Sequence, residues 1–111
     1  RGGNDIKVQW QFKDTNLHSV WDSKMIDAFD MSYTEMASNT DYLTRNQIKD
    51  LQKGSVIDWV NETQQLAKEV YASVSEGDNL RNEYSYKYFS TVRSQLQKGG
   101  IRLAKVLNDL F

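Results

Sequence analysis

The chain has 111 residues, of which 39% are hydrophobic and 12% aromatic, so it suits one small domain with a core. Its 14 basic and 15 acidic residues give a formal net charge of -1, which argues against a surface that holds nucleic acid through its phosphates by basic residues alone. The absence of cysteine excludes disulfides and thiolate zinc sites, and no apolar run approaches the roughly 18 residues of a membrane span. If the protein handles phosphate groups, metal ions must supply the positive charge.

The first expected element is a β-strand over residues 5–13. Apolar and polar residues alternate there, with Ile6, Val8, Trp10 and Phe12 on one face. No other segment alternates as well, and a lone strand cannot satisfy its backbone hydrogen bonds. We therefore expect its partner to lie upstream of residue 1, so that this strand is one half of a hairpin.

The following residues predict three helices. An amphipathic stripe over residues 17–29 indicates the first, with Thr15 or Asn16 as its N-cap. Two short helices are expected to begin after Ser32 and Thr44, because each is followed three residues later by a glutamate or glutamine, the spacing of a capping box.

Two longer helices complete the expected organisation. Apolar periodicity predicts one over residues 55–74 and another over residues 84–110, with a turn at residues 76–79 between them. Gly99 and Gly100 lie inside the last helix at a cost of about 1 kcal/mol each, which close packing against a neighbouring helix would explain. The expected fold is therefore mainly α, with one strand at its front.

The most informative pair of residues is His18 and Asp22. On a helix their spacing places an imidazole and a carboxylate on one face, where they can bind zinc. Zinc needs at least three protein ligands, and the chain has no cysteine and no second histidine. Two interpretations stay open on these grounds: a hydrogen bond on a helix surface, or part of a metal site whose other ligands lie outside this sequence. The second interpretation is favoured by the neighbouring Leu17 and Trp21, which belong to the apolar stripe. They place Asp22 at the edge of a core, where a carboxylate needs a partner.

Three segments resemble a known family. Gly2-Gly3-Asn4, then a strand, then Asn16-Leu17-His18-x-x-Trp21-Asp22, resemble the zinc-dependent single-strand-specific nucleases, the S1/P1 nuclease family, which has the helical phospholipase C-like zinc fold. Two later helices continue the resemblance through Trp59, Glu62, Thr63, Leu66, Ala67 and Tyr71, and through Gln95, Leu96, Gly100, Ile101, Arg102, Leu103, Ala104, Leu107 and Asn108. The resemblance implies that residues 1–111 are the C-terminal part of a single zinc nuclease domain.

The resemblance also implies a set of site residues. The complete enzyme is expected to hold three zinc ions, of which this chain partly ligands at most one. His18 and Asp22 match the last two metal ligands, which share their ion with a histidine shortly before Gly2. Gly2, Gly3 and Asn4 match a segment that lines the nucleobase pocket. No catalytic residue beyond the metal ligands is expected here, so the fragment alone should be inactive.

The implied reaction is hydrolysis of phosphodiester and 3′-phosphomonoester bonds in single-stranded DNA or RNA. Two zinc ions would activate water and the third would bind phosphate oxygens. The implied partners are a single-stranded nucleic acid and the N-terminal portion of the same enzyme. Fungal and plant members carry disulfides, so the lack of cysteine indicates a bacterial member, and family habit implies a periplasmic or secreted location. Two alternatives stay open: a helical interaction module without catalysis, and a phospholipase C-type phosphodiesterase of the same fold.

Overall fold

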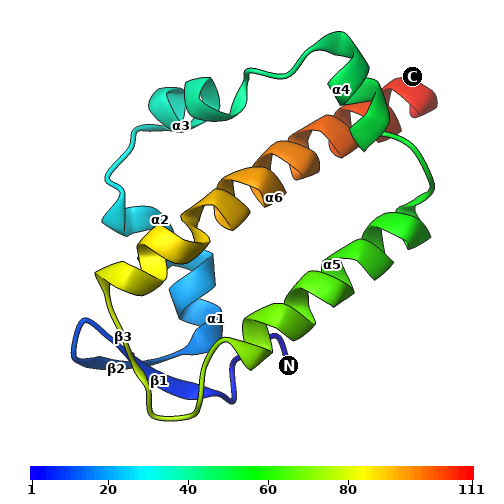
Figure 1. Cartoon of the computed structure of the whole chain (residues 1–111). Coiled ribbons are helices and arrows are strands. Elements are labelled where there is room, and N and C mark those ends of the chain that lie inside the picture. The colour runs from blue at the N-terminus through cyan, green and yellow to red at the C-terminus, as the bar shows by residue number, and fades with distance from the viewer.

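A computed structural model describes residues 1–111 and confirms a mainly α-helical chain with a strand hairpin near its start (Figure 1). The hairpin and the first helices gather at one end of the molecule, and the long last helix runs from this end to the other. None of the helices combines the length and the apolar character that crossing a lipid bilayer requires.

The three-stranded sheet corrects the expected strand pairing. Strand β1 (Lys7–Trp10) is central, pairing antiparallel with β2 (Lys13–Asn16) and parallel with β3 (Asn79–Leu80). The expectation of an upstream partner was wrong for this chain. Gln11 and Phe12 form a two-residue hairpin turn with φ values of 50° and 69°, and the alternating pattern ran through this turn because neither residue is a usual turn former.

The first helix is continuous but irregular. It consists of α1 (Leu17–Ser19), a π-helical segment η1 (Val20–Lys24) and α2 (Met25–Ala28). Its N-cap is Asn16, whose side-chain oxygen accepts a hydrogen bond from the Ser19 backbone N–H at 2.9 Å. The predicted helix and one of its two predicted caps are therefore confirmed, whereas the π-helical segment was not expected.

The two short helices follow as predicted. Helix α3 (Tyr33–Thr40) begins after Ser32 and helix α4 (Arg45–Leu51) after Thr44. Both capping boxes are complete, because each cap hydroxyl accepts from the N3 backbone N–H and each N3 side chain returns to the cap.

The two long helices differ from expectation in detail. Helix α5 spans Val56–Ala72, and helix α6 spans Asn82–Leu110, starting two residues earlier than predicted. Gly99 and Gly100 do not pack closely against another helix of this chain: a β-carbon on either residue would meet no atom within 4 Å. That expectation was wrong within residues 1–111, and the two glycines form part of an open face of α6.

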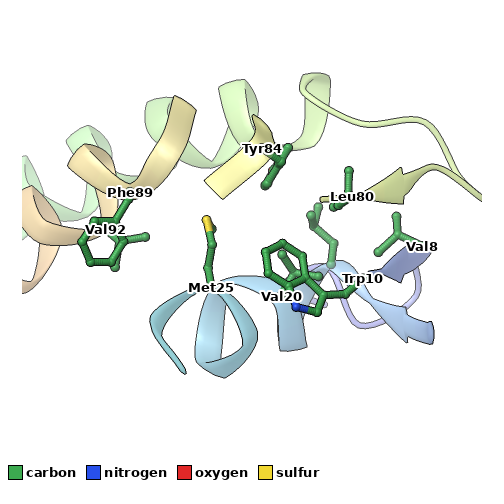
Figure 2. Close-up of a cluster of buried hydrophobic side chains, with 9 residues drawn as sticks. Val8, Trp10, Val20, Met25, Leu80, Tyr84, Phe89 and Val92 are labelled. Atoms are coloured by element: carbon green, nitrogen blue, oxygen red, sulfur yellow. The ribbon is translucent and has the colours of Figure 1, made fainter. Parts of the chain in front are cut away.

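The hydrophobic core lies at the sheet end of the molecule (Figure 2). It combines residues of the sheet, the first helix and the first half of α6, namely Val8, Trp10, Leu17, Val20, Met25, Leu80, Tyr84, Phe89 and Val92. By contrast, α3, α4 and α5 contain no buried residue. The sheet end alone has a closed core.

The open part of the molecule is held mainly by polar side chains. Glu62 on α5 forms ion pairs with Lys98 at 2.7 Å and with Arg102 at 2.8 Å, both on α6. The Arg102 guanidinium also lies 5.3 Å from the Trp59 ring centroid and donates from Nε to the Leu51 carbonyl oxygen at 3.0 Å. We call these residues the Glu62 cluster. It joins α4, α5 and α6 at the end far from the sheet.

The overall dimensions agree with this open arrangement. The radius of gyration is 15.6 Å, against about 13 Å for a compact domain of this length. The accessible surface is 7858 Å², against roughly 6300 Å² for a folded monomer of this mass. Exposed apolar side chains on α5 and α6, such as Val60, Leu103 and Leu107, contribute to this excess.

Candidate metal centre

His18 and Asp22 are presented by the helix that follows the hairpin. Leu17, Val20 and Met25 on the same helix are buried in the core, which fixes the rotation of the helix. His18 and Asp22 are both exposed in this chain and line the same cavity. Asp22 lies within the π-helical segment, where the Met25 backbone N–H bonds to the Val20 carbonyl oxygen. Such segments are rare and occur frequently at functional sites.

The imidazole of His18 is oriented by the turn before β1. Its Nδ1 lies 3.1 Å from the Gly2 carbonyl oxygen. A carbonyl oxygen can only accept, so Nδ1 must carry the proton in this hydrogen bond. The neutral ring then has its free lone pair on Nε2, which is the atom available to bind a metal.

A cavity of about 540 Å³ opens beside this pair. Its walls come from the first helix, from α5 and from α6, and most of its lining residues are apolar. The lining includes residues of all three segments that carried the family resemblance, namely Gly2, His18, Trp21, Asp22, Thr63, Leu66, Ala67, Tyr71, Gln95 and Leu96. The fold thus brings motifs that are far apart in the sequence to one place.

Trp21 lies between the two candidate ligands in sequence, lines the cavity and is held in place by a chain of hydrogen bonds. Its Nε1 donates to the Tyr84 hydroxyl at 2.9 Å, and Tyr84 contacts the Ser73 hydroxyl at 2.9 Å. Ser73 in turn donates to the Val70 carbonyl oxygen. Burial raises the pKa of Tyr84 above its usual 10.0, so it stays a neutral donor. Sequence reasoning missed Tyr84 and Ser73, since no local pattern indicates this link between the first helix, α6 and the end of α5.

The remaining candidates, Gly2, Gly3 and Asn4, form a turn at the edge of the cavity. Gly2 lines the cavity, whereas Gly3 is buried beneath His18 and does not. Asn4 is exposed, and its Nδ2 donates to the Arg1 carbonyl oxygen at 2.8 Å. Only Gly2 of these three therefore shares the cavity with His18 and Asp22 in this chain.

The donor set fits a zinc ion in part. A neutral imidazole with a free Nε2 and a carboxylate one turn away are both groups that zinc binds. No third His, Cys, Asp or Glu joins them to form a metal-binding group. Since a zinc site needs at least three protein ligands, this pair is an incomplete set that ligands from outside residues 1–111 would have to complete.

Comparisons with known proteins found one matching family and several similar proteins. The sequence matches the S1/P1 nuclease family over residues 1–111. It is 34% identical to Endonuclease 2 of Arabidopsis thaliana over 127 aligned residues, which cover 100% of this chain and 43% of that protein. It is 31% identical to Endonuclease 3 of the same plant, covering 99% of this chain and 43% of that protein. The chain therefore belongs to the S1/P1 nuclease family and spans less than half the length of these relatives.

The family match confirms the resemblance. The matched family and the relatives named above are nucleases, so membership supports a nuclease function and favours it over the phospholipase C and interaction-module alternatives. The relatives named above come from a plant, so a bacterial origin stays a prediction drawn from the missing cysteines.

Proposed function

We propose that this chain is the C-terminal part of a zinc-dependent endonuclease and 3′-nucleotidase that hydrolyses single-stranded DNA or RNA. The observation that carries the proposal is the placement of His18 and Asp22 on the wall of the cavity, with Nε2 of His18 left free. In the reaction, a water oxygen attacks phosphorus, the ester P–O bond breaks and the leaving oxygen takes a proton. A periplasmic or secreted location is part of the proposal, and its support is family habit alone.

His18 Nε2 and Asp22 would hold one zinc ion together with a histidine from the preceding part of the enzyme, and this ion would supply positive charge to phosphate oxygens. This accounts for a nuclease whose chain has a net charge of -1, because the metal replaces a basic surface. Gly2 and Gly3 with Asn4 would border the nucleobase, with the Asn4 amide as a partner for a base edge. Residues 1–111 contain no further catalytic group in this proposal, so the chain alone would be inactive.

The N-terminal portion of the same enzyme is the proposed partner of the open face. Apolar residues on α5 and α6, among them Val60 and Leu103, are exposed here. The accessible surface exceeds that of a closed monomer by roughly 1500 Å², which is more than the roughly 800 Å² that each partner buries in a standard interface. Relatives of more than twice this length supply enough chain to cover it.

The test uses the complete protein and the variants His18→Ala and Asp22→Asn. Each should lose about one zinc ion per molecule, measured by plasma mass spectrometry, and most of its activity on single-stranded DNA. Asp27→Asn is the matched control, because Asp27 is an exposed carboxylate on α2 that does not line the cavity. Unchanged zinc content and unchanged rate in both site variants would refute the proposal. Activity on a choline phospholipid, with none on DNA, would assign the phospholipase C function instead.

A further inference from the structure

We infer that the Gly2–Gly3 turn is a positioning element for His18, and that the Gly2 carbonyl fixes the ring so that Nε2 faces the cavity. The inference deepens the proposed function and rests on it, because it takes His18 as a metal ligand. It gives the two glycines a role that is separate from any contact with a nucleobase.

Hydrogen bonds attach the turn to His18 at two points. The Gly2 carbonyl oxygen accepts from the His18 side chain at 3.1 Å, and the Gly3 carbonyl oxygen accepts from the His18 backbone N–H at 3.3 Å. The Gly3 carbonyl also accepts from the Ile6 N–H at 3.2 Å, and the Ile6 carbonyl accepts from the Leu17 N–H at 3.0 Å. The turn, the start of β1 and the start of α1 therefore form one bonded unit around the ring.

This arrangement requires glycine at position 3. Gly3 has a φ of +87°, which side-chain-bearing residues rarely adopt, and it is buried. A β-carbon there would lie 3.1 Å from the His18 backbone nitrogen and 3.3 Å from the Leu17 β-carbon. Neither neighbour can move freely, since Leu17 is in the core and His18 lies in the first turn of a helix. A side chain at position 3 would thus push the turn away from His18.

Gly2 has a milder requirement. Its φ is +63°, within the left-handed region that non-glycine residues occupy at some cost. A β-carbon there would lie 3.4 Å from His18 Nδ1, an ordinary contact. The two positions therefore predict a graded response, larger at Gly3 than at Gly2.

The side chains of His18 and Asp22 differ in how firmly this chain holds them. The His18 ring is held by the turn, whereas the Asp22 carboxylate forms no hydrogen bond or ion pair within the chain. Partners that hold the second nitrogen of a metal-binding histidine set its orientation, and their loss typically weakens metal binding about 10- to 100-fold. The Gly2–Gly3 turn is placed to provide that support for His18.

The experiment compares Gly3→Ala with Gly77→Ala in the complete protein. Gly77 has a φ of +89° and nothing within 4 Å of its β-carbon position, so its variant introduces the same backbone strain away from the site. Zinc affinity is measured by competition with a graded chelator, and thermal unfolding of the zinc-free protein is measured alongside. We expect Gly3→Ala to lower the affinity of the His18 site about 10- to 100-fold and Gly77→Ala to leave it unchanged.

Gly2→Ala provides the second variant in case Gly3→Ala does not fold. We expect it to weaken zinc binding several-fold, with unfolding of the zinc-free protein close to that of Gly77→Ala. Zinc affinity within twofold of the unmodified protein in every folded variant at positions 2 and 3 would overturn the inference.

His18→Ala separates this inference from the proposed function. If His18→Ala removes the zinc ion but Gly3→Ala and Gly2→Ala do not weaken its binding, the positioning role is wrong and the metal site stands. If His18→Ala leaves the zinc content unchanged, the proposed function itself fails.

Discussion

The sheet end and the far end of this chain are stabilised in different ways. At the sheet end, nine apolar residues from the sheet, the first helix and α6 form a closed core. His18 and Asp22 lie on the first helix and line the cavity. At the far end, α4, α5 and the second half of α6 bury no residue completely and are joined by the Glu62 cluster. Figure 1 shows α5 following roughly the same line as α6, on the side of α6 away from α3 and α4.

This contrast shows which part of the candidate site is already organised in this chain. Burial of apolar surface is the dominant stabilising term, and only the sheet end has completed it. The ring of His18 is therefore held by a packed scaffold. The opposite wall of the cavity is formed by α5. This helix is held by the ion pairs of Glu62, and its apolar face is only partly covered by the rest of this chain. Three predictions follow this contrast, in order of decreasing expected effect.

The largest loss of stability is expected for Met25→Ala at the sheet end. Met25 is 0% exposed, so the variant should lower the free energy of unfolding by about 2–5 kcal/mol. The control is Leu103→Ala at the far end, where the side chain is 56% exposed and the change should stay within about 0.5 kcal/mol. Urea denaturation of the 111-residue chain measures both. Equal losses would contradict the division into a packed end and an open end.

A smaller loss is expected for Arg102→Ala in the Glu62 cluster. The Arg102 side chain is only 12% exposed, and it bonds to both Glu62 oxygens and to the Leu51 carbonyl. Removing it should cost about 2 kcal/mol, because hydrogen bonds that involve charged groups contribute more than neutral ones. Lys105→Ala is the control, since its pair with Asp109 is a solvent-exposed contact within one helix and should contribute less than about 0.5 kcal/mol. A matching effect of the two variants in thermal or urea unfolding would show that the cluster is an ordinary surface contact.

The smallest expected effect is a pH dependence from Glu62. Hydrogen bonds from Arg102 and then from Lys98 lower the pKa of Glu62 below its usual 4.5. A carboxyl group with a lowered pKa in the folded state stabilises it above the unfolded value, and this contribution is lost as the pH falls through the folded value. The side chain is 41% exposed, so solvent screening keeps the effect small.

Glu62→Gln tests this dependence. The difference in unfolding free energy between the unmodified chain and the variant should be constant above about pH 5 and should shrink as the pH falls below 4.5. Denaturant titrations at a series of pH values measure the difference. A difference that grows in acid would reverse the assigned sign and reject the ion pairs as its source.

Much of the secondary structure could be predicted because its signals are local. Capping boxes at Ser32 and Thr44 require only residues three apart, and the helical periodicity of α5 and α6 extends over many turns. The hairpin was misjudged because its turn, Gln11 and Phe12, lacks the glycine or asparagine that usually indicates a positive φ. The π-helical segment has no glycine or proline within it that would reveal it.

The candidate site divides in the same way. The spacing of His18 and Asp22 is a local property, so the sequence alone determined that both could face one side of a helix. The contact of the Gly2 carbonyl with the His18 ring, and that of Trp21 with Tyr84 across 63 residues, could be seen only once the chain was folded. The same holds for the open space around Gly99 and Gly100. The physical reason is that helix periodicity and capping act within a few residues, whereas cavities and ring orientations depend on how distant segments pack.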